Sequence, residues 1–187
     1  MKAPLLYVGG PLATARLTLE PLTPAHAGPM FTGFADPTLY LWVNAEPPRD
    51  VADLEGRFIR IADPYAPGGE LWLNWAIRVN DSGSHAGLIE ATVRPDRVVF
   101  LAFYAFTAFA RRGIAREACV AVIEHLWRAY DAAEIRADID FRNVPARCLV
   151  ESLGFVRRTR NIVTKLRGEP AIDYRYRLRR SEPPLGS

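Results

Sequence analysis

The ten residues FARRGIAREA, at positions 109–118, separate an apolar run from an amphipathic segment. Arg111, Arg112 and Arg116 stand at the start of that segment, where positive charge opposes a helix dipole at a cost of about 0.3–1 kcal/mol per charge. The backbone N–H groups of a first helical turn have no internal acceptors, and Gly113 lets a ligand approach them. These features predict an anion site. The alternative is a helix whose first turn is basic by chance. The helix itself is predicted over 114–130 by the spacing of Ala115, Cys119, Val122, Leu126 and Ala129.

The segments around this stretch predict an α+β domain. Three strands joined by short turns form an antiparallel meander, and the helix that follows leads to a fourth strand, as in a crossover between parallel neighbours. Before the meander we expect one more strand and two helices, and after it a further helix and a closing hairpin. The ranges, in chain order, are strand 16–21, helix 23–34, helix 50–62, strands 71–79, 85–94 and 98–106, helix 114–130, strand 135–141, helix 144–153, and strands 155–162 and 172–178.

Length and composition predict one soluble domain. The chain has 187 residues, of which 49% are hydrophobic and 24% charged, a typical globular balance. The domain is expected to span 1–180, with 181–187 as a flexible tail. The longest apolar run, 98–110, is too short to cross a bilayer, and prolines and glycines interrupt the start of the chain, so neither a membrane span nor a secretory signal is expected. Two cysteines without a C-x-x-C pair favour a cytoplasmic setting.

The positive charge of the chain is carried almost entirely by arginine. The 24 basic residues comprise 22 Arg and 2 Lys, against 21 acids, and give a net charge of +3. Arginine binds phosphate and carboxylate through a planar fork, although coding bias explains the excess equally well. The segment 157–180 holds nine basic residues and two acidic ones. Because tyrosine and arginine alternate along 174–177, stacking rings and arginines fall on opposite strand faces, which favours a solvated face over a nucleic-acid surface.

Several motifs together resemble those of one family. RRGIA, at 111–115, is similar to the pyrophosphate-binding segment [Q/R]-x-x-G-x-[G/A] of the GNAT acyl-CoA N-acyltransferases. RLTLEPL at 16–22 resembles the opening strand of the Rim-type branch, which includes N-terminal protein acetyltransferases. Further matches follow in the expected order over 16–178: WAI at 75–77, GLI at 87–89, NVPAR at 143–147 and ESLGF at 151–155.

The resemblance implies a fold and an activity. The fold is a GNAT-like three-layer α+β domain, with a twisted mixed sheet of about seven strands, a V-shaped splay and helices on both faces. The activity is transfer of an acetyl group from acetyl-CoA to a primary amine by direct attack in a ternary complex. The amine is a protein N-terminus or a small molecule, and homodimers are common among such enzymes. The rival interpretations are an acyl-CoA-binding module without efficient catalysis and a basic nucleic-acid-binding protein.

The resemblance also assigns cofactor-binding residues. Asn143 would hydrogen-bond the pantetheine, or simply cap its helix, and Arg147 would reach the nucleotide end. The backbone N–H of Ala105 would hold the thioester oxygen as it becomes an oxyanion. The pantetheine arm would lie against Phe103, Tyr104 and Ala105, and the pyrophosphate against Arg111, Arg112, Gly113, Ile114, Ala115 and Arg116.

The chain departs from the family pattern at three positions. Ala110 stands where Gln or Arg is usual, and Ala146 and Val150 stand where a hydroxyl would protonate the departing thiolate. The thiolate would leave unassisted, since a thiol pKa is only about 8.5, or take a proton from water, Cys148 or Tyr104.

The proton acceptor and the acceptor-binding residues are predicted from their positions in the sequence. Glu90, within an apolar strand, is the favoured general base, although an ordinary exposed strand position is the somewhat better explanation of this residue. Asp36, Glu46 and Asp140 are weaker alternatives as the base. Asp36, Trp42 and Glu46 belong to an early loop predicted to form one wall of the acceptor cleft, where the two carboxylates would hold a cationic acceptor. No metal is expected, because His26, His85 and His125 show no ligand spacing.

Overall fold

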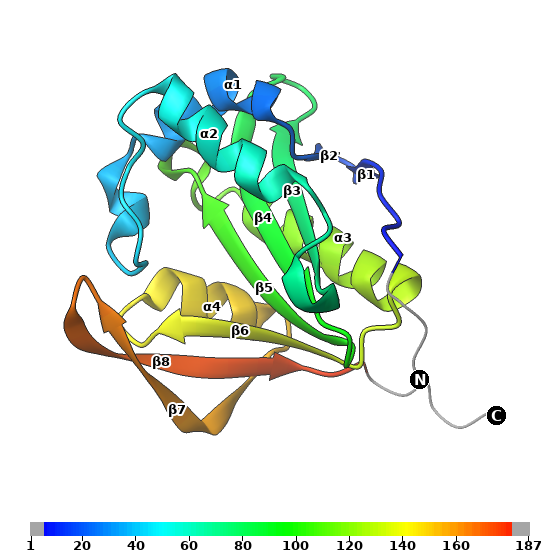
Figure 1. The fold of residues 1–187 in the computed structure, drawn as a ribbon, viewed down its shortest axis with the longest axis vertical. Coiled ribbons are helices and arrows are strands. Elements are labelled where there is room, and N and C mark those ends of the chain that lie inside the picture. The colour runs from blue at the N-terminus through cyan, green and yellow to red at the C-terminus, as the bar shows by residue number, and fades with distance from the viewer. Residues whose placement is uncertain (1–5, 181–187) are drawn as a thin grey trace.

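The computed structural model describes residues 6–180, so the predicted tail at 181–187 lies outside the described residues. Its centre is an eight-stranded mixed sheet (Figure 1) with the order β1-β2-β3-β4-β5-β6-β8-β7. The two-residue strand β1 was not predicted because it is too short to show alternation. The strands are β1 Leu12–Ala13, β2 Leu17–Pro21, β3 Leu71–Val79, β4 His85–Val93, β5 Val98–Ala105, β6 Glu134–Asp140, β7 Val156–Leu166 and β8 Glu169–Leu178.

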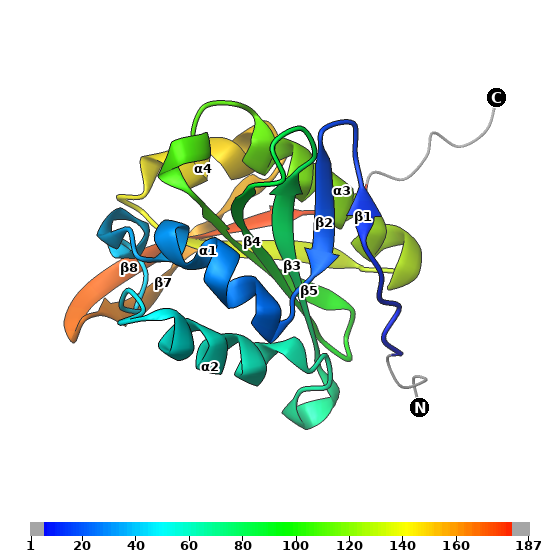
Figure 2. The ribbon, with the colours of Figure 1, turned by 90° about the horizontal axis from the view of Figure 1, so that it is seen from above.

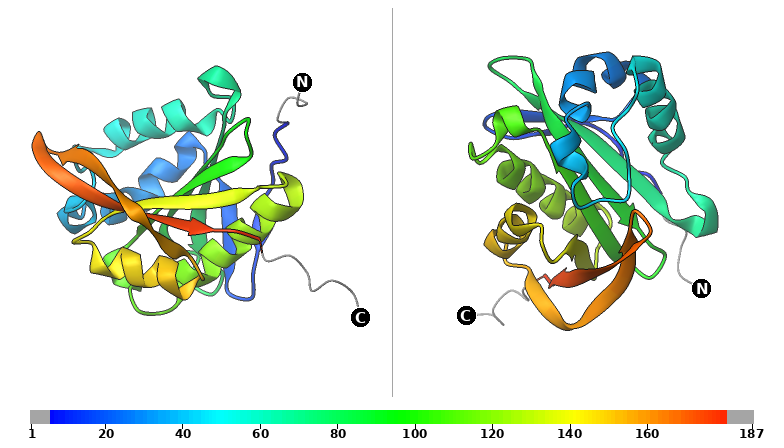
Figure 3. Two further views of the ribbon diagram at one scale, coloured as in Figure 1. Left: turned by 90° about the horizontal axis from the view of Figure 1, so that it is seen from below. Right: turned by 90° about the vertical axis from the view of Figure 1, so that its left-hand side faces the viewer.

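Helices cover both faces of the sheet (Figures 2 and 3). One layer, with its own apolar core, consists of α1 (Ala27–Phe34) and α2 (Val51–Ala62). The other consists of α3 (Ile114–Ala129) and α4 (Val144–Ser152), packed on the larger core. Short 3-10 helices lie at Pro24–His26, Pro37–Tyr40, Pro67–Gly69 and Thr107–Phe109. The predicted three-layer α+β fold is confirmed.

The sheet divides between β5 and β6. These parallel neighbours pair only at their beginnings, where Val98–Phe100 face Glu134–Arg136. The other edge of β6 pairs with β8 along 135–140, which holds β6 away from the rest of β5. The carboxyl half of β5, from Leu101 to Ala105, therefore pairs with β4 alone. This is the predicted V-shaped splay.

The closing hairpin is longer than its apolar pattern predicted. Its turn residues, Arg167 and Gly168, have φ of +52° and +87°, as a two-residue type I′ turn requires. The turn lets β7 and β8 pair as far as Leu166 and Glu169. Strand β8 lies between β6 and β7, so the last strand of the chain is an inner strand of the sheet.

The arginines of β8 are paired instead of merely solvated. Arg175 makes a two-bonded contact with Asp138, with N···O distances of 2.8 and 2.6 Å. Arg177 and Arg179 lie 3.5 and 3.2 Å from the same carboxylate oxygen of Glu134. Strand β6 therefore supplies the two carboxylates that pair with these three arginines across the β6–β8 ladder.

No helix of the described residues is long and apolar enough to cross a membrane. Both cysteines are free thiols, Cys119 buried and Cys148 exposed.

Candidate active site

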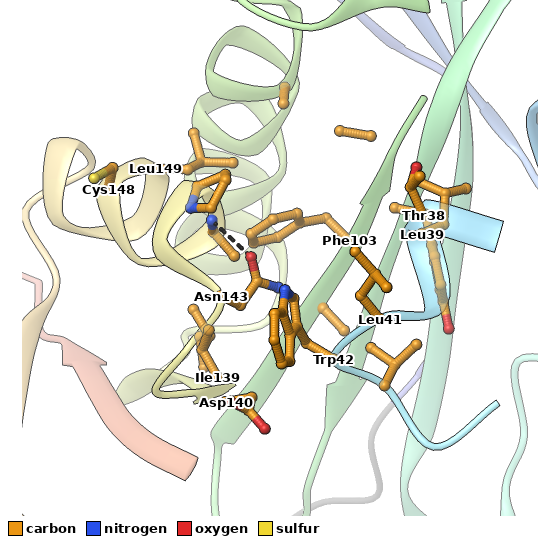
Figure 4. Close-up of a pocket in the computed structure, with 18 of the residues that line it drawn as sticks. Thr38, Leu39, Leu41, Trp42, Phe103, Ile139, Asp140, Asn143, Cys148 and Leu149 are labelled. Atoms are coloured by element: carbon orange, nitrogen blue, oxygen red, sulfur yellow. Dashed lines mark hydrogen bonds between the residues drawn. The ribbon is translucent and has the colours of Figure 1, made fainter. Parts of the chain in front are cut away.

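A cavity of about 900 Å³ opens where β5 and β6 part. Figure 4 shows Phe103 of β5, Asn143 and Leu149 of the α4 region, and Trp42 beside Asn143. The walls come from five segments: the loop at 38–44, the end of β5 with the turn that follows it, the start of α3, the end of β6 with α4, and the β7–β8 hairpin.

One end of the cavity is built to receive an anion. Arg111 and Gly113 both adopt left-handed backbone, with φ of +61° and +74°, so the chain turns sharply just before α3. Gly113 is the N-cap of α3. Because glycine has no Cβ, it adopts this left-handed conformation without the steric strain that another residue would have. Both residues line the cavity, as do Ile114, Ala115 and Arg116. The N–H groups of this first turn have no helical acceptors and complement negative charge.

The backbone of β5 offers a hydrogen-bonding edge to the cavity. The N–H of Phe106 donates to the carbonyl of Ala86, 2.9 Å away, which makes this a hydrogen-bonded pair of the β4–β5 ladder. Because bonded and non-bonded pairs alternate in an antiparallel ladder, the preceding pair, Ala105 with Gly87, is non-bonded. The N–H groups of Ala105 and Phe103 therefore point away from β4, into the gap beside β6.

The start of α4 forms the opposite wall. The Asn143 side-chain oxygen accepts the N–H of Ala146 at 3.2 Å, so Asn143 caps its helix (Figure 4). Its side-chain NH₂ group makes no hydrogen bond to the described residues. Ala146 also lines the cavity. The cavity therefore joins an anion-binding turn to a β-strand edge and to a free amide donor, a shape suited to a long ligand with phosphates at one end.

The family model of the acetyltransferase (GNAT) domain matches residues 16–156. The chain belongs to the GNAT acetyltransferase family. Its members are acyl-CoA-dependent N-acetyltransferases, and the resemblance noted in the motifs is thereby confirmed.

Solved GNAT structures share the whole fold. A GCN5-related N-acetyltransferase from Brucella melitensis superposes with a TM-score of 0.78 at 18% identity, covering 91% of this chain and 78% of the other. RimL, a ribosomal L7/L12 alpha-N-protein acetyltransferase solved with coenzyme A, gives 0.80 at 12% identity, with 91% and 98% covered. A GNAT acetyltransferase from Bacillus anthracis gives 0.79 at 13% identity, with the same coverages. No curated protein sequence matches the chain significantly.

Two arginines predicted to bind CoA are turned away from the GNAT cavity. Arg112 lies over the Phe109 ring, 5.7 Å from its centre, and does not line the cavity. Arg147 donates to the carbonyl of Phe141 at 2.9 Å and to the Tyr176 hydroxyl at 3.2 Å. Because Phe141, just after β6, and Tyr176 of β8 already accept hydrogen bonds from its guanidinium, the predicted contact of Arg147 with the nucleotide has no support in this geometry.

Arg16 supports the anion-binding turn, which the sequence did not indicate. Its guanidinium donates to the carbonyl of Arg112 at 3.1 Å and lies 2.6 Å from a carboxylate oxygen of Glu117. Thr14 donates to the other oxygen of Glu117, also at 2.6 Å. Burial raises the pKa of Glu117, but these hydrogen bonds outweigh it and the net shift is downward. Residues before β2 thus hold the first turn of α3 in place.

Replacing Arg16 with alanine is expected to weaken CoA binding about threefold to tenfold, because the turn loses its anchor and one nearby positive charge. Isothermal titration of CoA measures the effect. Arg49→Ala is the matched control, since Arg49 pairs with Asp53 on α2 and does not line the cavity. Equal affinities for the two variants would show that Arg16 does not support the site.

The predicted carboxylates do not all reach the cavity. Asp36 accepts hydrogen bonds from Thr38 and, at 2.6 Å, from Thr107, so it ties the early loop to the end of β5. Those bonds lower its pKa. Glu46 does not line the cavity either. The prediction that Asp36 and Glu46 hold a cationic acceptor is therefore not supported by their positions.

Glu90 and Tyr104 lie on the sheet face covered by α1 and α2. Tyr104 lines the cavity and packs against the rings of Phe34 and Tyr40. Burial, with the nearby charge of Glu90, raises its pKa to about 12. Burial also raises the pKa of Glu90, which does not line the cavity. Any proton that reaches Glu90 must therefore pass through an intervening group such as water or the Tyr104 hydroxyl.

Near the end of β6, one acid is bound by arginine and an acid of the adjacent strand β8 is not. Asp140 is bound by the Arg142 guanidinium at 2.9 and 2.6 Å, and Arg142 in turn lies 4.7 Å from the centre of the Trp42 ring. Trp42 lines the cavity, as predicted for the acceptor wall. Asp173 of β8 also lines it, and the sequence analysis did not single it out because Asp173 lies in a strand of arginines.

Two histidines meet, contrary to expectation. Their side chains come together across β2, β4 and the 3-10 helix before α1, with His26 and His85 each 3.3 Å from one oxygen of Glu20. Arg78 holds the other oxygen at 2.7 Å. The N–H of Thr23 donates to Nδ1 of His26 at 3.0 Å, which favours the tautomer whose Nε2 donates a proton to Glu20. The ligand atoms of Glu20, His26 and His85 lie within 4.8 Å of one another, a spacing that would also admit a metal ion.

Proposed function

We propose that the protein transfers an acetyl group from acetyl-CoA to a primary amine, by direct attack within a ternary complex. The observation that carries the proposal is that one cavity is continuous from the turn at 111–116 to the opposite end of the site. It passes the free edge of β5 and ends between the 38–44 loop and the β7–β8 hairpin, where aspartates line its wall. CoA and amine can thus be held at once, which orients nitrogen and carbonyl for attack.

The residues divide the work along this path. The amides of 113–116, with the charges of Arg111 and Arg116, would bind the pyrophosphate. The edge of β5 at Phe103 and Ala105, with the free amide of Asn143, would hold the pantetheine. Acetyl-CoA supplies the activated thioester. As the amine nitrogen attacks, its new C–N bond places negative charge on the carbonyl oxygen, which the Ala105 N–H would stabilise. The C–S bond then breaks.

The thiolate would leave without a dedicated acid. Ala146 lines the cavity but carries no hydroxyl, and Val150 is fully buried in the core and does not line it. A thiol of pKa about 8.5 is acidic enough to leave as thiolate. Tyr104 keeps its proton at neutral pH, so its hydroxyl would stabilise the thiolate by hydrogen bonding. Glu90, reached through Tyr104 or water, would accept the proton that the amine loses.

Ala146→Ser is expected to raise kcat about threefold to tenfold, because the new hydroxyl supplies a proton to the leaving thiolate. Thiol release from acetyl-CoA, followed with a chromogenic disulfide, measures the rate. Ala146→Val adds volume without a hydroxyl and serves as control. A serine variant no faster than the wild type would indicate that departure of the thiolate does not limit turnover.

Thiol release also tests the whole proposal when it is measured over peptides with free N-termini and over small primary amines. Tight CoA binding with no turnover on any amine would favour the second candidate, an acyl-CoA-binding module. The absence of a hydroxyl at Ala146 is the observation that motivates that candidate.

We further propose a cytoplasmic protein that needs no metal and binds neither nucleic acid nor membrane. Its two free thiols suit a reducing compartment. The pairing of Arg175, Arg177 and Arg179 with carboxylates of β6 leaves less free positive charge for a polyanion. A homodimer is our expectation from the family, and light scattering after gel filtration tests it.

A further inference from the structure

Asp173 is the carboxylate of the active-site cavity that has no partner. Three aspartates line this cavity. Asp138 is bound twice by Arg175, and Asp140 twice by Arg142. The Asp173 side chain makes no hydrogen bond or ion pair with any described residue, although it is partly buried. A partly buried carboxylate without a partner is unfavourable unless a ligand supplies the missing donor.

The strand register makes the unpaired charge of Asp173 still more unfavourable. Asp173 stands directly opposite Asp140 in the β6–β8 ladder. Like charges at opposed positions of one sheet face repel each other. Burial raises the pKa of Asp173, the charges of Asp140 and Asp138 raise it further, and Arg142 lowers it. Because Arg142 already satisfies Asp140, a cation that entered the cavity would relieve this repulsion.

The surroundings of Asp173 suit a primary ammonium group. Apolar and aromatic side chains from the 38–44 loop and the hairpin share the cavity wall with it, among them Leu41, Trp42 and Leu166. Arg167 joins these two segments, since its guanidinium donates to the carbonyl of Tyr40 at 2.8 Å and its N–H to Asn44 at 3.2 Å. Figure 1 shows this loop, between α1 and α2, extending toward the hairpin.

We infer that Asp173 binds the ammonium group of the acceptor, and that the protein selects primary amines that are cationic and carry an apolar group beside the nitrogen. The bound ammonium would lose one proton to water before its nitrogen attacks, and the second proton would pass to Glu90 as the amide forms. The inference rests on the proposed acetyl transfer for its site, but Asp173 binds the amine whether or not transfer follows. Trp42, stacked by Arg142, would contact the apolar group. The cation is thus bound by a residue of β8 and not by Asp36 and Glu46, for which this role was predicted.

The test compares Asp173→Asn with Glu55→Gln, which removes the same charge from an exposed position of α2 that lines neither this cavity nor the small pocket beside Trp42. The probes are tyramine, spermidine and a short peptide with a free N-terminus. Loss of one charged hydrogen bond is expected to raise the KM of an accepted amine about 10- to 100-fold in Asp173→Asn, with the Kd of CoA unchanged. Glu55→Gln should leave both constants within twofold of the wild type.

Calorimetric titration of each amine into the CoA-bound protein keeps the test independent of turnover. Weaker amine binding by Asp173→Asn supports the inference even if no acetyl transfer occurs, in which case only the proposed catalysis fails. Equal amine KM or Kd for Asp173→Asn and Glu55→Gln overturns it, as does failure of the wild type to bind any of the three cationic amines. A merely structural role would change the Kd of CoA and the melting temperature together with the amine constants.

Discussion

Ala105→Pro is expected to lower kcat about 100-fold or more without unfolding the protein. Proline removes the backbone N–H that the register directs into the gap between β5 and β6. Loss of one oxyanion donor typically costs 10²–10³ in kcat. Because that N–H does not bond to β4, the ladder keeps all its hydrogen bonds, and proline is tolerated at such an edge position. Thiol release and thermal melting measure the two effects separately.

Ala102→Pro is the matched control on the same strand. Three residues earlier, Ala102 faces Glu90 as a hydrogen-bonded pair, so its N–H belongs to the ladder. Here proline should lower the melting temperature markedly. If Ala105→Pro kept kcat within threefold of the wild type, the Ala105 N–H would not be the oxyanion donor.

Gly87→Ala should lower the melting temperature by about 5–10 °C and abolish most activity. A Cβ at Gly87 would lie 2.0 Å from the carbonyl oxygen of Tyr104 and 3.3 Å from Cα of Ala105, and both of these are backbone atoms that cannot rotate aside. Its φ of +157° adds strain for any residue with a Cβ. The collision is relieved only by moving the end of β5, which is the edge proposed to hold the thioester.

Gly28→Ala controls for the general effect of glycine replacement. Gly28 lies in α1, and a Cβ there meets no atom within 4 Å. Alanine should therefore be neutral or stabilise the helix by up to about 1 kcal/mol. Scanning calorimetry and the acetylation assay compare the two variants. A Gly87→Ala protein with wild-type stability and rate would mean that β4 and β5 adjust freely at the splay.

Local patterns predicted most elements because their physical causes are local. The strand predicted at 71–79 is β3 as observed, and apolar spacing predicted α2 one residue too early, at 50–62, because Asp50 caps the helix instead of belonging to it. The Asp50 side chain accepts the N–H of Asp53 at 2.7 Å. The hairpin was predicted too short, since the Arg167-Gly168 turn depends on backbone angles that its composition only weakly indicates.

The same local patterns were enough to predict the part of the site at the starts of α3 and α4. A helix start and a capping side chain are properties of consecutive residues, so the sequence by itself determined the turn at 111–116, which we propose binds an anion, and the position of Asn143. Together with the order of the motifs, they determined the GNAT family as well.

Only the tertiary structure decided which side chains serve the cavity. Arg147 and Asp36 bind other partners, Arg16 reaches the turn from the segment before β2, and Asp173 faces the cavity because β8 pairs with β6. These outcomes depend on which strands become neighbours and on which donors reach each carboxylate first. Both are set by contacts between residues far apart in the chain, which no local pattern of side chains encodes.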